Sequence, residues 1–391
     1  MITRAITKVL EKSARQYPVV TVLGPRQSGK TTLAKSTFPE YAYANLEDPE
    51  LRLLARNDPK EFLERFAAPV IIDEVQRVPE LLSYIQVRVD ETPDAKGSYV
   101  LTGSQQLNLR ATITQSLAGR TALLKLLPLA LTELAAAGIS RTRDEYIFEG
   151  FMPRHYNEDL DPVSLYRNYY ETYVERDVSQ LLSLRNRPAF ELFLKLLAGR
   201  IGQVVNLHAL SGEVGVSSTT LKEWVSVLEA SFVVFRLPPY FENFGKRFIK
   251  SPKLYFTEIG LAAYLLEIRS SSHVARDPLL GNLFENMVVI EALKARYNSG
   301  CDADMYFFRD QSGFEVDLVK SEHRQLTPIE IKAARTFSPD FISALKKFSA
   351  LSDRVTDGAV IYAGDQEQKY KGCRLLRFTN TGSLFQSETQ F

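Results

Sequence analysis

Short apolar runs separated by helical patterns fill the first part of the chain. The run PVVTVLG at 18–24 ends in glycine and leads through a glycine-rich turn into TTLAKSTF, which has helical character. Similar runs occupy 68–75 and 97–104. Near-continuous apolar strands of this kind are typical of a parallel sheet covered on both faces. We therefore expect an α/β domain over residues 1–155.

Helical patterns take over after this domain. From Asp161 to Leu197 the chain is rich in tyrosine and leucine at helical spacing, and a second helix is expected after Pro188. Residues 156–200 are therefore predicted to form a helical connector.

Residues 201–272 carry the pattern of two helices and a hairpin. Leu207 and Leu210 mark the apolar face of the first helix, and Ser217 or Ser218 would cap the second. In the second helix apolar residues recur at i, i+3, i+4 and i+7, namely at Leu221, Trp224, Val225 and Leu228. Two strands around a basic loop come next, so we expect a winged helix-turn-helix domain.

The last part of the chain, 273–391, alternates a helix with strands. The helix is expected at 283–297, and the strands at 305–310, 314–320, 327–333 and 358–364. This pattern predicts a second, smaller α/β domain.

Composition places the chain among ordinary soluble proteins. Its 391 residues suggest two or three domains, and 45% hydrophobic with 24% charged residues exclude disorder as the main state. Lys and Arg number 48 against 47 Asp and Glu, a net charge of +1. Any affinity for nucleic acid must therefore come from a local patch.

Several classes of protein are disfavoured by what the chain contains. Two cysteines form no disulfide framework, which favours a reducing cytoplasm. The opening segment MITRAITKVLEKSARQYP predicts an amphipathic helix and not a signal peptide. Charged residues and Pro128 interrupt the apolar stretch from Leu123 to Ala137, so no membrane segment is expected. The four scattered histidines predict no zinc site.

A nucleotide site is predicted directly after the first apolar run. Residues 24–31, GPRQSGKT, fit G-x-x-x-x-G-K-[ST] between an expected strand and an expected helix. Such a loop presents backbone N–H groups to phosphates, while Lys30 neutralises phosphate charge and Thr31 offers a hydroxyl to Mg²⁺. The predicted nucleotide-binding residues are Gly24, Pro25, Arg26, Gln27, Ser28, Gly29, Lys30, Thr31 and Thr32.

Two carboxylates end the second apolar run. Asp73 would hold Mg²⁺ together with Thr31, and Glu74 would deprotonate the attacking water. Without other motifs, Asp73 and Glu74 would be interpreted as a solvent-exposed acidic pair at a strand end. The glycine-rich loop earlier in the sequence favours the catalytic interpretation. The third run ends at Thr102 and Ser104, where a hydroxyl would reach the γ-phosphate or the water; a plain turn is the alternative.

A charge-stabilising arginine would complete the site. The candidates are Arg110, Arg120 and Arg176, each of which is also compatible with an ordinary surface ion pair. An arginine supplied by a second chain would require an oligomer.

Several motifs together carry a resemblance to a known family. They are GPRQSGKTTL, VIIDEVQRVPELL, YVLTGSQQL, SLAGRTALLKLLPLALTEL, YVERDV, SGFEVDLV and PIEIKA. In combination they resemble the prokaryotic AAA+-type P-loop ATPases with a C-terminal domain of unknown function. The resemblance implies an AAA-type module, a winged helix and a restriction-endonuclease-like domain. It also implies ATP and Mg²⁺ at Lys30, Thr31, Asp73 and Glu74, with Arg120 and Arg176 near a nucleotide.

A second constellation lies in the C-terminal domain. Glu285 falls in the expected helix, Asp317 in a strand, and Glu330 with Lys332 in the next strand, where they share a face. The order resembles the PD-(D/E)xK nuclease core. In such a core Asp317 and Glu330 would ligate Mg²⁺, Glu285 would assist through a water, and Lys332 would orient the nucleophile or stabilise the phosphate. The alternative is a salt-bridged strand face, or a vestigial site for recognition or structure.

Basic residues gather around the expected hairpin. Five lie from Arg236 to Lys253 against one acid, Glu242, and aromatic residues are interleaved with them. Basic residues on a wing contact phosphates, although the expected recognition helix is poor in arginine, so a protein-docking role is the alternative. The candidate DNA contacts are Lys222, Arg236, Lys246, Arg247 and Lys250.

These predictions combine into a multidomain cytoplasmic ATPase. Binding and hydrolysis of Mg²⁺-ATP would reposition the winged-helix and nuclease-like domains, with duplex DNA or a protein as partner and no membrane association. One alternative is an ATP-controlled DNA nuclease that uses Asp317, Glu330 and Lys332. The other is a non-hydrolysing, nucleotide-dependent protein-binding switch.

Overall fold

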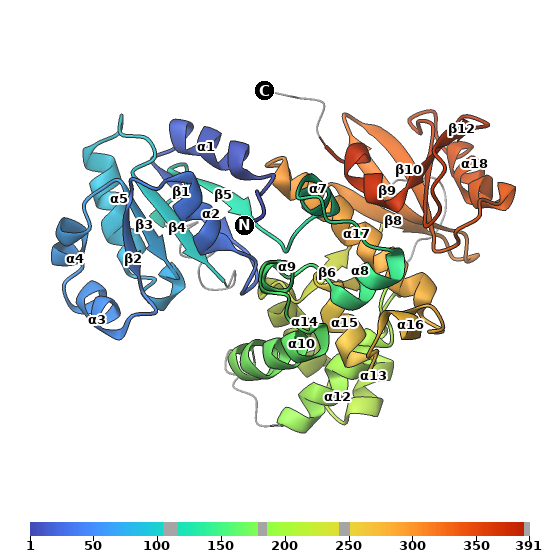
Figure 1. The fold of residues 1–391 in the computed structure, drawn as a ribbon, viewed down its shortest axis with the longest axis horizontal. Coiled ribbons are helices and arrows are strands. Elements are labelled where there is room, and N and C mark those ends of the chain that lie inside the picture. The colour runs from blue at the N-terminus through green and yellow to red at the C-terminus, as the bar shows by residue number, and fades with distance from the viewer. Residues whose placement is uncertain (105–115, 179–185, 242–250, 387–391) are drawn as a thin grey trace. The chain divides into compact units, whose positions relative to one another are not determined.

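The chain divides into two compact units. The computed structural model describes residues 1–104, 116–178, 186–241 and 251–386 (Figure 1). Unit 1 comprises Met1–Leu129 together with two short later segments, Ala230–Phe232 and Tyr297–Cys301. Unit 2 comprises Ala130–Glu229, Val233–Arg296 and Asp302–Phe391.

Unit 1 is built on a five-stranded parallel sheet. In spatial order its strands are β2 (Ala42–Asn45), β3 (Val70–Asp73), β4 (Tyr99–Gly103), β1 (Val19–Leu23) and β5 (Thr121–Lys125). The central strands β1, β3 and β4 are buried along their whole length, as their apolar runs predict. Because all five strands run in one direction, the carboxyl ends of β1, β3 and β4 meet at one edge of the sheet.

Short helices connect and cover these strands. They are α1 (Thr7–Gln16), α2 (Lys30–Thr37), α3 (Pro49–Asn57), α4 (Pro59–Arg65), η1 (Val75–Arg77) and α5 (Leu81–Glu91). Asp48 caps α3 by accepting from the backbone of Glu50, and Pro49 begins the helix. These local signals fix where the covering helices begin.

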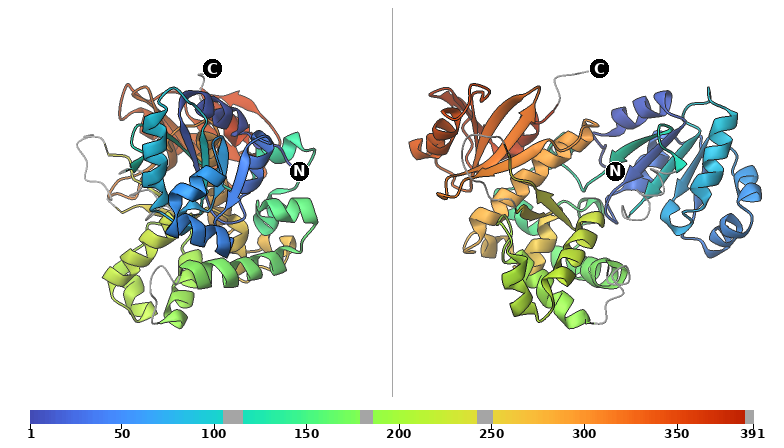
Figure 2. Two further views of the ribbon diagram at one scale, coloured as in Figure 1. Left: turned by 90° about the vertical axis from the view of Figure 1, so that its left-hand side faces the viewer. Right: turned by 180° about the vertical axis from the view of Figure 1, so that it is seen from behind.

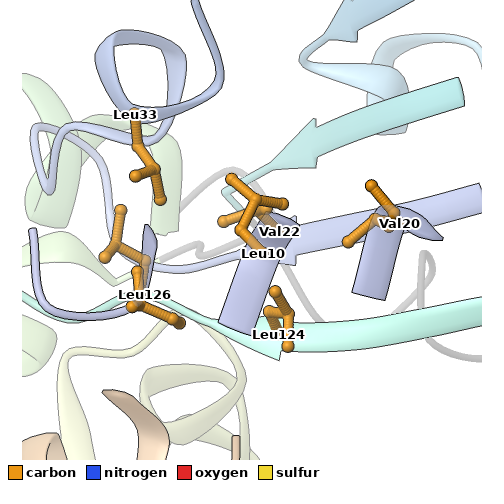
Figure 3. Packing of buried hydrophobic residues seen from close by; sticks show 8 residues of the cluster. Leu10, Val20, Val22, Leu33, Leu124 and Leu126 are labelled. Carbon is orange, nitrogen blue, oxygen red and sulfur yellow. The ribbon is translucent and has the colours of Figure 1, made fainter. Parts of the chain in front are cut away.

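The amphipathic N-terminal helix packs where its periodicity predicts. Residues Ile6, Leu10 and Ala14, four apart, turn one face of α1 into the core. They join Val20 and Val22 of β1 and, from further elements, Leu33, Leu124 and Leu126 (Figure 3). The helix therefore covers one face of the sheet over β1 and β5.

The first part of unit 2 is helical. Its helices are α7 (Leu131–Ala136), α8 (Arg143–Glu149), α9 (Pro153–Glu158), α10 (Pro162–Tyr169) and the π-helix η2 (Tyr170–Val178). Thr142 and Glu145 form a capping box at the start of α8. The aromatic pattern beyond Asp161 is helical as expected, but the helix widens to π geometry at Tyr170.

Three helices and a hairpin follow. They are α12 (Arg187–Ala198), α13 (Leu207–Val214), α14 (Ser218–Ala230), β6 (Val234–Leu237) and β7 (Lys253–Phe256). The two strands are antiparallel, and a further bridge joins Val204 to Lys253. The Ser217 hydroxyl accepts from the backbone N–H of Thr220 at 3.1 Å and so caps α14. The right-hand view of Figure 2 shows this group from behind.

The C-terminal part of unit 2 carries a mixed sheet. Its strands, in spatial order, are β12 (Gln368–Tyr370), β13 (Cys373–Arg377), β11 (Ala359–Tyr362), β10 (Gln325–Lys332), β9 (Glu315–Glu322) and β8 (Met305–Arg309). The helical elements of this part are α15 (Ile259–Leu265), α16 (Ser271–Val274), α17 (Leu280–Asn298), η3 (Pro339–Ile342), α18 (Ser343–Ser349) and η4 (Phe378–Leu384).

The architecture confirms the predicted fold class. A parallel α/β sheet is followed by a helical region and a second sheet with both parallel and antiparallel pairs. Within the described ranges, no helix combines the length and apolar character that crossing a membrane requires.

Candidate functional site

The glycine-rich loop lies at the carboxyl edge of the parallel sheet, between β1 and α2. The backbone N–H of Gly24 donates to Gly103 at the end of β4. A side chain on Gly24 would collide with the carbonyl oxygen of Leu126. Gly29 has a φ of 90°, which L side chains rarely adopt. Both glycines are therefore required by the path of the loop itself.

Lys30 folds back over this loop. Its Nζ donates to the carbonyl oxygen of Pro25 at 2.8 Å, and 5% of the residue is exposed. Burial lowers the pKa of Lys30 to about 8, although the nearby carboxylates of Glu74 and Asp73 act in the opposite direction. The loop thus holds a desolvated ammonium beside two carboxylates, a strong attractor for phosphate oxygens.

Asp73 collects hydroxyl groups from three elements. Thr31 of α2 donates to its Oδ2 at 2.8 Å and Tyr43 of β2 donates to the same atom at 2.9 Å. Thr102 of β4 donates to Oδ1. Burial and then the charge of Asp73 raise the pKa of the Tyr43 hydroxyl, so it remains a donor. A threonine hydroxyl beside a strand-end carboxylate is a donor set suited to Mg²⁺.

Glu74 turns away from the strand toward the end of β4. Its backbone is left-handed, with φ 57° and ψ 44°. Its Oε2 accepts from the hydroxyl of Ser104 at 3.1 Å and from the side-chain amide of Gln76. Gln76 also donates to Ser104, at 3.0 Å. The structure therefore brings together Glu74 and Ser104, as the sequence suggests, and adds Gln76.

An arginine outside every recognised motif supports the loop. Arg4 precedes α1, is 9% exposed, and donates to the carbonyl of Ser28 at 2.6 Å and to that of Leu127 at 2.7 Å. It therefore ties the glycine-rich loop to the segment that follows β5. Sequence reasoning missed Arg4 because it stands alone at the start of an amphipathic helix, with no motif around it.

Further charges lie at the rim of the loop. Glu47 pairs with Arg77 at 2.8 Å and with Arg26, a loop residue, at 3.5 Å. Partial burial acts against ionisation of Glu47, but the hydrogen bond from Arg77 and the two arginine charges lower its pKa.

Of the candidate arginines, the structure does not bring Arg120 to the loop. It directly precedes β5, whose first residue Thr121 is in register with Val19 at the start of β1. The loop follows the other end of β1, roughly 16 Å away at about 3.3 Å per residue. Arg120 forms a bidentate pair with Asp90, at 2.6 and 2.9 Å. Arg110 and the side chain of Arg176 lie outside the described part of the chain.

The second constellation also comes together, in unit 2. The Lys332 Nζ lies 2.5 Å from Glu330 Oε2 and 3.3 Å from Asp317 Oδ2. Burial, and then the charge of Asp317, raise the pKa of Glu330 to about 8. For Glu285, burial and the charge of Asp317 raise the pKa to about 7, against the opposing effect of Lys253.

Lys253 differs from its expected place on a basic loop. It begins β7, is 2% exposed, and its Nζ contacts Glu285 at 2.9 Å and Glu315 at 2.5 Å. It is therefore a buried partner of the carboxylates and unavailable to DNA. Tyr255 joins the group by donating to Glu285 at 2.6 Å. No short motif relates β7 to α17, so sequence reasoning missed both residues.

Two of the five candidate DNA contacts lie at a cavity of about 780 Å³ between α13, α14 and the hairpin. Lys222 and Arg236 line it, together with apolar Val225 and Leu254. Arg236 also donates to Glu229, at 2.7 Å. Lys246, Arg247 and Lys250 lie outside the described residues.

Three family matches cover most of the chain. Residues 16–135 match the family described as AAA domain. Residues 140–272 and 280–380 match two families described as domains of unknown function, DUF8612 and DUF4143 respectively.

Two curated relatives, one from Mycobacterium tuberculosis and one from Mycobacterium bovis, are both described as uncharacterized proteins. Each is 30% identical over 361 residues, which is 91% of this chain and 79% of the relative.

Among solved structures, the Walker-type ATPase of Pyrococcus abyssi is similar to 66% of this chain over 94% of its own, with 16% identity and a TM-score of 0.43. AMPPCP-bound DnaA from Aquifex aeolicus is similar to 57% of this chain over 85% of its own, with 13% identity and a TM-score of 0.28.

Proposed function

This chain belongs to the same family as the two uncharacterized mycobacterial proteins, and we propose that it is a Mg²⁺-dependent ATPase. Its N-terminal unit is a P-loop AAA-type domain, so nucleotide binding is the activity of this unit. The observation that carries hydrolysis is the grouping of Lys30, the Thr31–Asp73 pair and Glu74 at one sheet edge.

Each residue of this group has a distinct proposed role. Lys30 leaves the Pro25 carbonyl and binds phosphate oxygens, for which its desolvated ammonium is well suited. Thr31 and Asp73 hold Mg²⁺, which neutralises phosphate charge when bound. Glu74 accepts a proton from the attacking water. The hydroxyl of Ser104 orients the Glu74 carboxylate and supports this assignment.

The position of Arg120 favours a role between chains. It lies at the sheet edge opposite the P-loop, paired with Asp90 on the protein surface. We propose that Arg120 serves a neighbouring chain's nucleotide, which requires an oligomer and release from Asp90. Arg176 is the second candidate for this role.

For unit 2, the proposed function is to bind DNA. The order of α13, α14 and the β6–β7 hairpin, with the Val204–Lys253 bridge, supports a winged helix within 201–272. Lys222 forms no ion pair within the described residues and lies with Arg236 at the cavity, which favours phosphate contacts there. Hydrolysis would then reposition this domain and the C-terminal sheet domain at 273–391, linked to the ATPase domain at 1–155 by a helical connector at 156–200.

Phosphate release from ATP by the purified full chain tests the proposal. We expect a Mg²⁺-dependent rate that falls by about 10² to 10⁴ in Glu74→Gln, because a general base is removed. Glu80→Gln, an exposed carboxylate at the start of α5, is the matched control and should keep the wild-type rate. ATP binding without turnover in wild type would contradict hydrolysis and favour the binding switch.

Duplex DNA added at low salt tests the DNA partner separately. A rate that rises with DNA, and a rise that weakens in Lys222→Glu, would support DNA association through the winged helix. A Glu74-dependent rate that is indifferent to DNA would keep the ATPase and contradict the DNA partner.

A further inference from the structure

A cluster of opposite charges, only partly exposed to solvent, lies in unit 2, where β7 and α17 meet the C-terminal sheet. Its members are Glu285 of α17, Glu315 and Asp317 of β9, Glu330 and Lys332 of β10, and Lys253 of β7. The cluster therefore joins the region of the chain that ends at residue 272 to the region that begins at residue 280.

Lys253 occupies the middle of the cluster. Its Nζ bridges Glu285 Oε1 at 2.9 Å and Glu315 Oε1 at 2.5 Å. The hydroxyl of Tyr255 donates to the same oxygen of Glu285. With 2% of the residue exposed, Lys253 is held inside the protein by β7, which pairs with β6.

Each of the four carboxylates pairs with a lysine ammonium. A metal ion such as Mg²⁺ needs several oxygens converging at about 2.0–2.1 Å. Here Asp317 Oδ2 accepts the backbone N–H of Ile331 at 2.8 Å and lies 3.3 Å from Lys332. Within the described residues, no group of three or more Asp, Glu, His or Cys residues is placed to hold a metal ion. The residues therefore do not fit the metal that the resemblance to a nuclease core implies.

We propose that Lys253 takes the place of a divalent cation in this cluster. While Lys253 is in position, its ammonium neutralises Glu285 and Glu315, and the cluster takes up no Mg²⁺ or Mn²⁺. The cluster then links the hairpin to the C-terminal sheet through ion pairs, and it does not cut DNA. This inference is independent of the ATPase proposed for unit 1.

Removal of the lysine should create a metal site. Lys253→Met keeps an unbranched side chain, one atom shorter, and deletes the charge. Four carboxylates then face Lys332 alone, apart from Arg309, which pairs with Glu315 at 3.3 Å. We expect Mn²⁺ to bind the full-length Lys253→Met variant without nucleotide at least tenfold more tightly than it binds wild type. Titration calorimetry or the electron paramagnetic resonance of free Mn²⁺ measures this.

Three matched variants sharpen the test. Lys253→Arg keeps a cation and should bind Mn²⁺ like wild type, as should Lys369→Met, which changes an exposed lysine of β12. Adding Asp317→Asn to Lys253→Met should abolish the gained site. A folded Lys253→Met protein with wild-type Mn²⁺ affinity would overturn the proposal.

A second measurement, which compares wild type with variants that keep Lys253, holds even if Lys253→Met does not fold. We expect Asp317→Asn to leave the Mn²⁺ affinity of an otherwise unchanged chain unaltered, because the cluster binds no metal. Mn²⁺ binding that Asp317→Asn removes, or Mn²⁺-dependent DNA nicking that Lys332→Ala removes, would overturn the proposal.

Discussion

Replacement of Arg4 should loosen the P-loop although Arg4 lies outside it. The side chain donates to the carbonyl of Ser28, inside the loop, and to that of Leu127, beyond β5. Arg4→Met deletes both donors while keeping much of the apolar stem. The Ser28 carbonyl then loses its charged partner, and the loop is held less firmly in the path that phosphate binding uses.

The size of the effect follows from one hydrogen bond. A hydrogen bond to a charged group contributes about 1.5–3 kcal/mol, and only the bond to Ser28 touches the loop. If the binding of ATP must restore the order lost with this bond, the lower figure corresponds to roughly a tenfold weaker Kd. We expect Arg4→Lys to lie between wild type and Arg4→Met, because lysine retains the charge but not the two-pronged geometry.

Titration with a fluorescent ATP analogue measures the change in Kd. Arg15→Met, which alters an exposed arginine in the last turn of α1, should bind the analogue like wild type. Circular dichroism establishes that each variant is folded. An Arg4→Met protein that is folded and has an unchanged Kd would refute a positioning role for Arg4.

Three further predictions concern other polar groups. Tyr43→Phe removes one hydroxyl donor from Asp73 and, at about 1 kcal/mol, should weaken Mg²⁺-dependent ATP binding roughly fivefold in a Mg²⁺ titration. The raised pKa values of Glu285 and Glu330, about 7 and about 8, mean that the folded chain binds more protons than the unfolded chain between pH 4.5 and those values. Stability contributed by these groups should therefore be lost as pH rises from about 5 to 8. Because Asp317→Asn removes a charge that raises both pKa values, the melting temperature of this variant should fall less between pH 5.5 and pH 8.5 than that of wild type. An equal fall in the two proteins would contradict this cause. Arg120→Ala should leave the melting temperature nearly unchanged, because the ion pair of Arg120 is exposed, while ATP turnover falls at least tenfold. Unchanged turnover would exclude a role for Arg120 in hydrolysis.

The nucleotide site was predictable because each of its motifs is a short run of residues that are consecutive in the sequence. A P-loop and a strand-end Asp73 are both written in contiguous residues, and the parallel order of β1 and β3 then brings them to one edge. Tyr43 and Gln76 were not predictable in the same way. Tyr43 reaches Asp73 through the register of β2 with β3, and Gln76 through the left-handed backbone at Glu74.

Two strands of the first sheet also escaped the sequence pattern. Both lie at the edges, and β2 and β5 are only partly buried, so neither presents a continuous apolar run. The widening of the helix at Tyr170 leaves the apolar spacing nearly unchanged over one turn, and periodicity alone does not distinguish it from an ordinary α-helix.

Lys253 shows how a local count of charges misleads. Within its own segment it adds to a run of basic residues, which favours an interface with phosphates. Its partners Glu285 and Glu315 lie 32 and 62 residues further along the chain, on α17 and β9. Only the three-dimensional arrangement identifies the carboxylates that neutralise it.

Unit 1 includes residues that come long after its sheet in the sequence. The segment Tyr297–Cys301 belongs to it, with the ring of Tyr297 4.7 Å from the Lys125 ammonium and Gly300 pressed against Val9 of α1. During synthesis, the five strands therefore leave the ribosome well before the last piece of their own unit. A recombinant fragment cut after β5 lacks that piece and its contacts with Lys125 and Val9.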